Sequence, residues 1–314
     1  MRKLILVAMA LQLSVAGLFA ENGLIKLSPC EGGVPQALAL GGGGTSTSGS
    51  IKVLSWNIFM LPKIAGNTGQ AMRAKGIIDA LKNTDYDVIV FQEAWTKKVR
   101  AAIWEGLKAT YPYDAGNPLK GGVTITNSGI WIISKLPIKT RIDKLYRECD
   151  GADCFARKGA TLIEVEKDGK TFQIVGTHLQ ADEGKAKQKV RNEQYYDLNK
   201  LLGEAHKDGV AQIIAGDFNT PVTDTARYNY MLRSIKLEDG PLSGNMQYTW
   251  DNTTNDITHG QKDTSQVTLD YIFTRANGFN FVSERRVIKR FQVRWACDKI
   301  DLSDHYAMEG VFEY

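Results

Sequence analysis

Six short apolar runs in this sequence each end at, or contain, polar side chains that can hold a metal ion or act on a phosphate. These polar residues are Asn57, Glu93, His178, Asp217, Asn219, Asp270, Asp304 and His305. Apolar runs form buried strands, and strands can hold the polar groups at their ends rigidly along one edge of a sheet. Taken singly, residues of these types more often cap turns and helices. Because six runs carry mutually compatible chemistry, we interpret the set as one site.

The chemistry that suits this set is hydrolysis of a phosphodiester. A phosphodiester is an anion that repels a nucleophile, and a hard divalent cation bound by carboxylate and amide oxygens offsets that repulsion. Glu93 is the first predicted ligand of Mg²⁺, with Asn57 beside it and Asp304 as a third. Since oxygen ligands discriminate poorly among hard ions, Co²⁺ or Mn²⁺ are alternatives to Mg²⁺.

Two of the four histidines fall in the set and predict acid–base chemistry. His305 can take a proton from water near neutral pH, and Asp270 is the natural carboxylate to orient its ring. His178 would donate a proton to the charge that builds in the transition state. Asp217 and Asn219 would position the water or stabilise the phosphoryl oxygens. The sequence contains no zinc-type Cys/His spacing, no P-loop glycine pattern and no Gly-x-Ser-x-Gly.

The elements that position these residues alternate between strands and helices. Apolar runs predict strands over 53–56, 88–91, 130–134, 172–176, 212–215 and 268–274. Helical periodicity places Met72, Ile77, Ile78 and Leu81 on one helix face, and it predicts further helices through 99–107 and about 185–205. Sheets covered by helices follow, in one α/β catalytic domain over 51–314.

The first fifty residues are expected to lie outside this domain. Residues 1–20 combine a basic start, an uncharged apolar run and small residues before Glu21, which predicts a cleaved signal peptide and a secreted protein. A membrane anchor is the alternative, but the run is short for a bilayer. Residues 21–50 end in a Gly/Ser-rich stretch that predicts a flexible segment. Without residues 1–20 the chain has 37 basic and 35 acidic residues, which is too balanced for a nucleic-acid surface.

Four cysteines in an exported protein predict two disulfides. Three pairings are possible. Cys149 and Cys154 enclose only four residues, so a local bridge is the simplest choice, and Cys30 would then pair with Cys297.

The ordered motifs resemble the endonuclease/exonuclease/phosphatase (DNase I-like) superfamily over 51–314. The motifs that carry the resemblance are Trp56-Asn57, Phe91-Gln92-Glu93, Gly176-Thr177-His178-Leu179, Gly216-Asp217-Phe218-Asn219, Leu269-Asp270-Tyr271 and Ser303-Asp304-His305. The resemblance implies a four-layer sandwich of two mixed β-sheets flanked by helices. It also implies the roles given above for the site residues.

Within that superfamily the chain is similar to the bacterial neutral sphingomyelinases (sphingomyelinase C). The similar stretches are 53–62, 157–159, 176–182 and 248–255. This similarity implies hydrolysis of sphingomyelin to ceramide and phosphocholine at a membrane surface. We expect a monomer that contacts membranes peripherally and binds no nucleic acid.

Four further residues are candidates for substrate contact: Lys158, Trp250, Phe291 and Trp295. Lys158 could touch the phosphate, or it could be a surface lysine beside a turn glycine. The two aromatic residues at 291 and 295 stand among basic residues, which suits a lipid interface. Alternatively they belong to a core strand with charged neighbours.

Two other functions remain open from the sequence. A secreted endonuclease of the same superfamily would need basic residues grouped near the site. The loops at 182–183 and 251–255 are instead acidic or neutral. A non-enzymatic binding module on the same fold would be expected to lack a catalytic group, and none is missing here.

Overall fold

A computed structural model describes residues 49–62, 66–119, 126–156, 158–258 and 263–314. The predicted signal peptide and nearly all of the segment 21–50 lie outside these ranges.

The helices are α2 (Gln70–Leu81), α3 (Lys97–Leu107), α4 (Lys185–Glu204), α5 (Thr225–Ile235) and the short 3-10 helix η2 (Gly151–Phe155). The strands are β1 (Ser50–Asn57), β2 (Val88–Gln92), β3 (Tyr113–Asp114), β4 (Trp131–Ser134), β5 (Thr140–Leu145), β6 (Gly159–Lys167), β7 (Lys170–His178), β8 (Ala211–Asp217), β9 (Leu242–Ser243), β10 (Trp250–Asp251), β11 (Gln266–Val267), β12 (Asp270–Arg275), β13 (Ser283–Lys289), β14 (Gln292–Ala296), β15 (Lys299–Asp301) and β16 (Ala307–Glu313).

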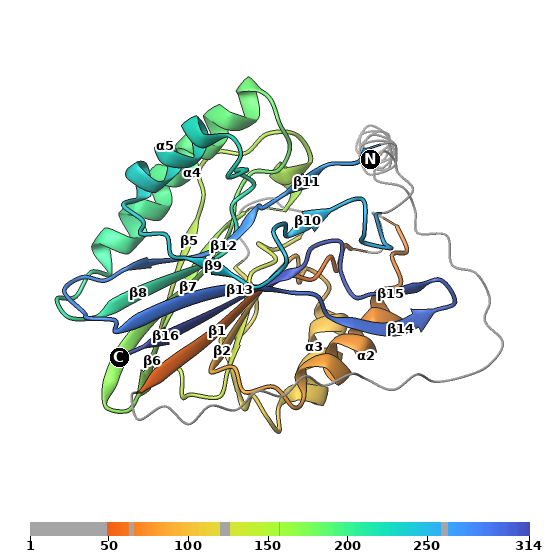
Figure 1. Cartoon of the computed structure of the whole chain (residues 1–314), viewed down its shortest axis with the longest axis horizontal. Helices are drawn as coiled ribbons and strands as arrows, with labels where there is room; N and C mark the ends of the chain where they lie inside the picture. The colour runs from red at the N-terminus through yellow and green to blue at the C-terminus, as the bar shows by residue number, and fades with distance from the viewer. Residues whose placement is uncertain (1–48, 63–65, 120–125, 157, 259–262) are drawn as a thin grey trace, which may run out of the picture.

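Two large mixed sheets form the centre of the domain (Figure 1). The larger has the strand order β3-β4-β2-β1-β16-β13-β9, and the smaller has the order β12-β8-β7-β6-β5. Strands β1 and β2 are parallel, as are β7 and β8, whereas β16 and β12 run antiparallel to β1 and β8. Both sheets are therefore mixed, as expected.

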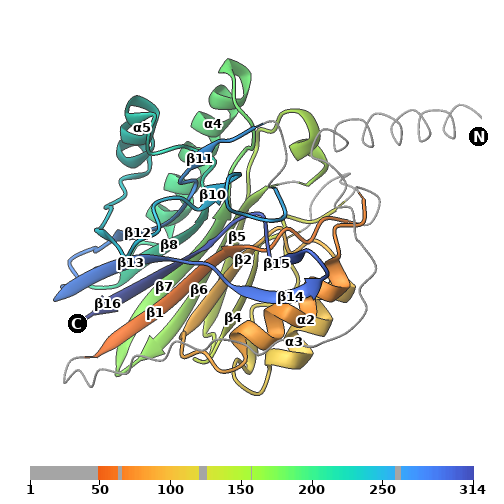
Figure 2. The same ribbon diagram turned by 45° about the vertical axis from the view of Figure 1, so that its right-hand side comes forward.

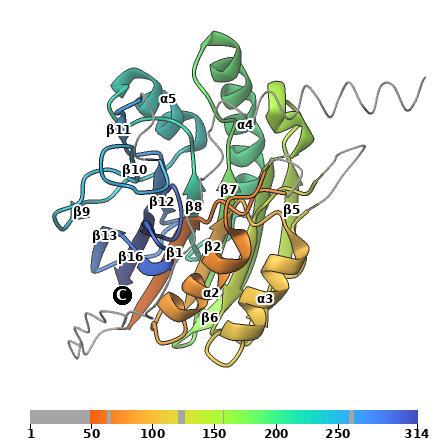
Figure 3. The ribbon, with the colours of Figure 1, turned by 90° about the vertical axis from the view of Figure 1, so that its right-hand side faces the viewer.

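The sheets pack face to face over a continuous apolar core. Val53 and Val90 of the larger sheet share this core with Ile174 and Ile213 of the smaller one, and all four are fully buried. Helices α2 and α3 cover the outer face of the larger sheet, and α4 and α5 cover the outer face of the smaller sheet (Figures 2 and 3). This arrangement confirms the four-layer sandwich.

Helix α2 differs from its predicted pattern in one position. Ile77 and Leu81 are fully buried, but the side chain of Met72 is 42% exposed. The buried stripe instead passes through Arg73, Ala74 and Ile77, at the i, i+1 and i+4 spacing of a helix face. The prediction that Met72 lies on the buried face is therefore wrong. The next residue, Arg73, lies on that face instead, and its guanidinium is buried.

Strand registers bring the predicted site residues to one edge of the sandwich. In the parallel pairs, Asn57 lies opposite Gln92 and His178 lies opposite Asp217. Asp270 opens β12, which runs antiparallel to β8, so it also lies opposite Asp217. The last residues of four strands and the first residue of a fifth therefore meet at the same edge.

Left-handed backbone conformations follow all four of these strands. The residues concerned are Phe59 (φ 49°) after β1, Glu93 (φ 56°) after β2, Asp182 (φ 66°) after β7 and Asn219 (φ 47°) after β8. Residues other than glycine rarely adopt this backbone conformation, because their Cβ atom approaches the backbone too closely. Four such turns at one edge indicate that the surrounding structure imposes the exit direction of each strand.

One of the two predicted disulfides can be examined. Cys149 and Cys154 are bonded, as predicted, and close a loop that includes most of η2. The second predicted pair includes Cys30, which lies outside the described residues. Across the described ranges, no helix has both the length and the apolar character needed to cross a membrane.

Candidate active site

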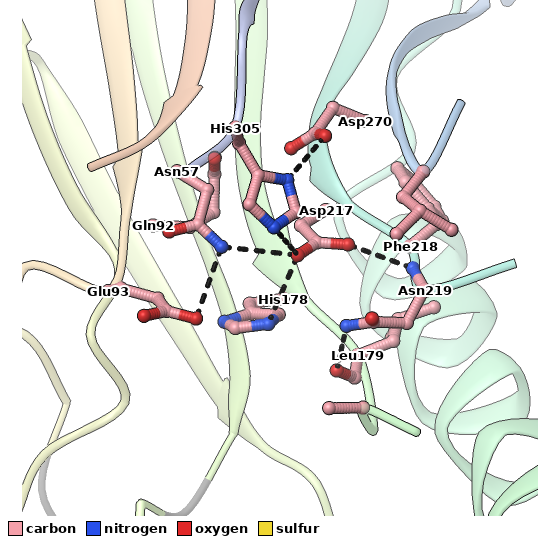
Figure 4. Close-up of polar contacts among 12 residues, drawn as sticks. Asn57, Gln92, Glu93, His178, Leu179, Asp217, Phe218, Asn219, Asp270 and His305 are labelled. Carbon is pink, nitrogen blue, oxygen red and sulfur yellow. Dashed lines mark hydrogen bonds and ion pairs between the residues drawn. The ribbon is translucent and has the colours of Figure 1, made fainter. Parts of the chain in front are cut away.

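Asn57 connects the two sheets at the centre of the site (Figure 4). Its side-chain nitrogen donates to Glu93 Oε1 at 3.1 Å and to Asp217 Oδ2 at 3.2 Å. Its oxygen accepts from the backbone N–H of Phe59 at 3.2 Å. The amide is fully buried, so these bonds fix its orientation. Asn57 therefore holds the carboxylates of the two sheets at a set separation.

A histidine–carboxylate pair lies beside Asn57. His305 Nδ1 is 2.8 Å from Asp270 Oδ2, and both side chains are buried. The indole of Trp250 meets the His305 ring edge to face at 4.9 Å between centroids. Burial lowers the pKa of His305, but the charges of Asp270, Asp217 and Asp304 outweigh it and raise that pKa well above its ordinary value. The pair has the geometry predicted for a base and its orienting carboxylate.

Asp217 lies between the two histidines. Its Oδ2 is 3.4 Å from His178 Nε2 and 3.9 Å from His305 Nε2. Burial and the neighbouring charge of Asp270 raise the pKa of Asp217 to about 6. Its Oδ1 accepts from the backbone N–H of Asn219 at 2.9 Å, and the Asn219 side chain donates to Leu179 O at 3.0 Å. Asn219 thus ties the end of β8 to the end of β7.

Two groups of side chains fit a divalent cation. Burial and repulsion by Asp304 raise the pKa of Glu93 to about 8, and Glu93 Oε2 is buried with no hydrogen-bond partner among the described residues. Separately, Asp217, Asp270 and His305 offer ligand atoms within 4.8 Å of one another. Carboxylates crowded without a compensating cation are the environment that a hard metal ion stabilises. The predicted ligand set of Glu93, Asn57 and Asp304 overlaps the first group only.

A buried arginine beneath the site was not predicted. Arg73 of α2 is fully buried and donates to the backbone oxygens of Ile58, Phe59, Thr68 and Leu302. Burial lowers its pKa to about 10, and the charges of Asp304 and Glu93 oppose that shift. Arg73 therefore joins the turn after β1 to the segment before Asp304. An ionic residue inside a helix stripe is the sequence feature that could have revealed it.

Replacing Arg73 by methionine should destabilise the protein by about 3–5 kcal/mol, because four carbonyls would lose their donor inside the fold. Urea denaturation measures the difference. Lys75→Met changes an exposed residue of the same helix and should shift the midpoint little. An unchanged midpoint for Arg73→Met would show that water replaces the guanidinium.

Lys158 lies behind His178 rather than on the surface. It is 3% exposed, and its ammonium contacts His178 Nε2, Leu179 O and Asp153 Oδ2. An ammonium has three N–H donors, and all three are engaged. The predicted alternative of a solvated surface lysine is therefore wrong, because the side chain folds inward onto β7. The predicted phosphate contact stays a prediction.

Phe291 and Trp295 lie next to α2, in the core between that helix and the larger sheet. Phe291 contacts Trp56 at 4.9 Å between ring centroids, and Trp295 donates to Asp301 O at 2.7 Å. Both pack against the core beneath α2 and α3. This packing corresponds to the alternative of a core strand with charged neighbours, and Figure 1 shows β14 and β15 beside α2. Of the four candidates for substrate contact, Trp250 touches the ring of His305 and Lys158 touches the ring of His178.

Comparison with known sequences identifies the family of the chain. Residues 54–305 match the model of the endonuclease/exonuclease/phosphatase family. Sphingomyelinase C of Leptospira interrogans is 32% identical over an alignment of 317 residues, and this alignment covers 92% of the present chain. The chain spans 56% of the length of that relative.

Solved structures share the fold. A beta-toxin structure from Staphylococcus aureus superimposes with a TM-score of 0.77 at 25% identity, over 83% of this chain and 99% of that one. A mutant of the same toxin with bound magnesium ions gives a TM-score of 0.75 at 24% identity, over 83% and 99% of the two chains. The family match covers every residue of the site described above, from Asn57 to His305. This chain belongs to the endonuclease/exonuclease/phosphatase family.

Proposed function

We propose that this protein is a secreted, Mg²⁺-dependent phosphodiesterase that hydrolyses sphingomyelin to ceramide and phosphocholine. The observation that carries the proposal is the buried Asp270–His305 pair, 2.8 Å apart, beside a cluster of carboxylates. Such a pair supplies a base where a phosphate needs a nucleophile. Similarity to sphingomyelinase C supports the choice of substrate.

In the proposed reaction His305 activates a water molecule. Asp270 accepts a hydrogen bond from the Nδ1–H of His305, and in the neutral ring the lone pair of Nε2 is then free to take a proton from water. The water oxygen forms a bond to phosphorus, and the bond from phosphorus to the ceramide oxygen breaks. The ceramide oxygen takes up a proton from solvent and His305 returns its proton to solvent, so the products are ceramide and phosphocholine. Asn57 and Asp217, joined by a hydrogen bond, would face the reacting phosphate from the two sheets.

The metal would be held by Glu93 with Asn57 and Asp304, because the group of Asp217, Asp270 and His305 already contains the proposed base and its orienting carboxylate. When bound, a divalent cation polarises the phosphoryl oxygens and stabilises the negative charge of the leaving oxygen. The donors are oxygens of buried carboxylates and an amide, which suits Mg²⁺ and also admits Mn²⁺ or Co²⁺.

The surroundings of the site favour a lipid over a nucleic acid. The loops at 182–183 and 251–255 are acidic or neutral and do not supply the grouped basic residues that a polyanion such as DNA would need. The single phosphate of a lipid headgroup needs only local recognition. The apolar start of the sequence supports secretion, and we propose that the mature protein acts as a monomer at the membrane surface.

The test measures phosphocholine release from sphingomyelin vesicles, with and without Mg²⁺, while supercoiled plasmid is incubated in parallel. We expect metal-dependent release and intact plasmid. Metal-dependent nicking without phosphocholine release would reject the lipid substrate and favour a secreted endonuclease. Phosphatidylcholine vesicles of matched size distinguish recognition of the ceramide portion from recognition of the headgroup alone.

A further inference from the structure

The ammonium of Lys158 is fully committed inside the protein. It lies 2.6 Å from Leu179 O, 2.9 Å from Asp153 Oδ2 and 3.0 Å from His178 Nε2. A lysine has three N–H donors and no acceptor, so each of the three contacts uses one donor. His178 Nε2 must then act as an acceptor, which requires a lone pair on that nitrogen.

This constraint decides which nitrogen of His178 carries the ring proton. With a lone pair on Nε2, an uncharged ring has its proton on Nδ1. Nδ1 is buried and has no hydrogen-bond partner among the residues that the structure describes. The opposite tautomer would place an N–H 3.0 Å from an ammonium, with two donors facing each other. Asp217 Oδ2, 3.4 Å away, would be its only compensation.

The third partner of Lys158 belongs to the loop closed by the Cys149–Cys154 disulfide. Asp153 Oδ2 accepts both from Lys158 and from the backbone N–H of Ala181, at 2.7 Å. Across the same loop, Asp150 N donates to Gln180 Oε1 at 2.9 Å. The covalently closed loop is thus fastened to the segment that directly follows His178, and it fixes where the ammonium lies.

We propose that Lys158, held by Asp153 of the disulfide-closed loop, is a positioning residue that sets His178 in its Nδ1–H tautomer. Lys158 touches no substrate in this arrangement and acts only through the ring of His178. The tautomer decides which edge of the ring can donate to the phosphate, so its loss affects the reaction more than substrate binding. The part of the proposal that concerns catalysis rests on the proposed function, whereas the tautomer does not.

The experiment is ¹⁵N NMR of ring-labelled histidine in the full chain without substrate. Protonated and unprotonated ring nitrogens resonate in separate ranges, and the chain has only four histidines. His178→Gln assigns the resonances. We expect wild-type His178 to carry its proton on Nδ1, and we expect Lys158→Met to shift it to Nε2. Lys187→Met is the matched control, because Lys187 also contacts this loop, through Asp150, but does not contact His178.

Kinetics provide the second readout. Lys158→Met should lower kcat for phosphocholine release about 100-fold while KM stays within about twofold, whereas Lys187→Met should change neither. If Lys158→Met does not fold, Asp153→Asn takes its place in the test. Asp153→Asn should also shift the ring proton of His178 toward Nε2 and lower kcat, with smaller effects than those expected for Lys158→Met. An Nε2–H tautomer in the wild type, or an unchanged tautomer in the variant that folds, would overturn the proposal. If the wild type releases no phosphocholine, the proposed function fails and the NMR result alone decides the role of Lys158.

Discussion

Replacing His305 by alanine is expected to lower kcat for phosphocholine release by a factor of about 10²–10⁴, the usual contribution of a general base. The physical reason is that, of the two histidines in the site, His305 has an orienting carboxylate 2.8 Å from a ring nitrogen, whereas the nearest carboxylate oxygen to His178 lies at 3.4 Å. Asp270→Asn should approach the same loss, because an amide can donate to Nδ1 and so favour the wrong tautomer of His305.

The control for this prediction is His206→Ala. His206 is half exposed beside Asp208 and contacts none of the site residues, so its replacement should leave kcat unchanged. Thermal denaturation of all variants separates lost chemistry from lost folding. Residual activity of the His305→Ala variant within tenfold of wild type would assign the base to another group.

Removing the negative charge of Glu93 should have the second largest effect, and it should appear in metal binding. In wild type, Mg²⁺ is expected to raise the melting temperature, because the ion compensates carboxylates that burial and mutual repulsion destabilise. Glu93→Gln should lose most of this rise and at least 100-fold in kcat. Metal titrations monitored by melting temperature measure the first effect, and phosphocholine release measures the second.

The pH dependence of the metal-free protein provides a further check on Glu93. The pKa of its carboxyl is raised from 4.5 to about 8 in the fold. The stability that this shift contributes is therefore complete below about pH 4.5 and is lost as pH rises toward 8. In EDTA, wild type should lose more stability than Glu93→Gln across this range. Glu105→Gln, at an exposed position of α3, should behave as wild type; parallel curves for all three proteins would contradict the assignment.

The strands and helices that could be predicted are those whose apolar residues face a core. Strands β2 and β8 are buried along their whole length, and their continuous apolar runs predict buried strands at these positions. Strands β5 and β13 are rich in charged residues and only partly buried, so their sequences resemble loops. Pairing with β6 and β16 makes them strands, and that pairing is not visible in local sequence.

The convergence of the site could also be predicted, because polar residues that end neighbouring strands share a sheet edge. The buried positive charges that support the site could not be predicted. Arg73 and Lys158 are buried only because carbonyls and carboxylates distant in sequence surround them. The aromatic residues at Phe291 and Trp295 were compatible with a lipid interface or a core, and only the position of α2 shows how they pack.

The left-handed turns after β1, β2, β7 and β8 have a consequence for engineering and evolution. Each such residue costs about 1–3 kcal/mol that the rest of the fold must offset, least for Asp182 and Asn219 and most for Phe59 and Glu93. Glycine at Glu93 would relieve both this cost and the burial of a carboxylate, yet it would remove the predicted metal ligand. Selection for heat resistance alone would therefore favour substitutions at these turns, which carry the active-site residues. Variants chosen only for their stability would then have a lower kcat.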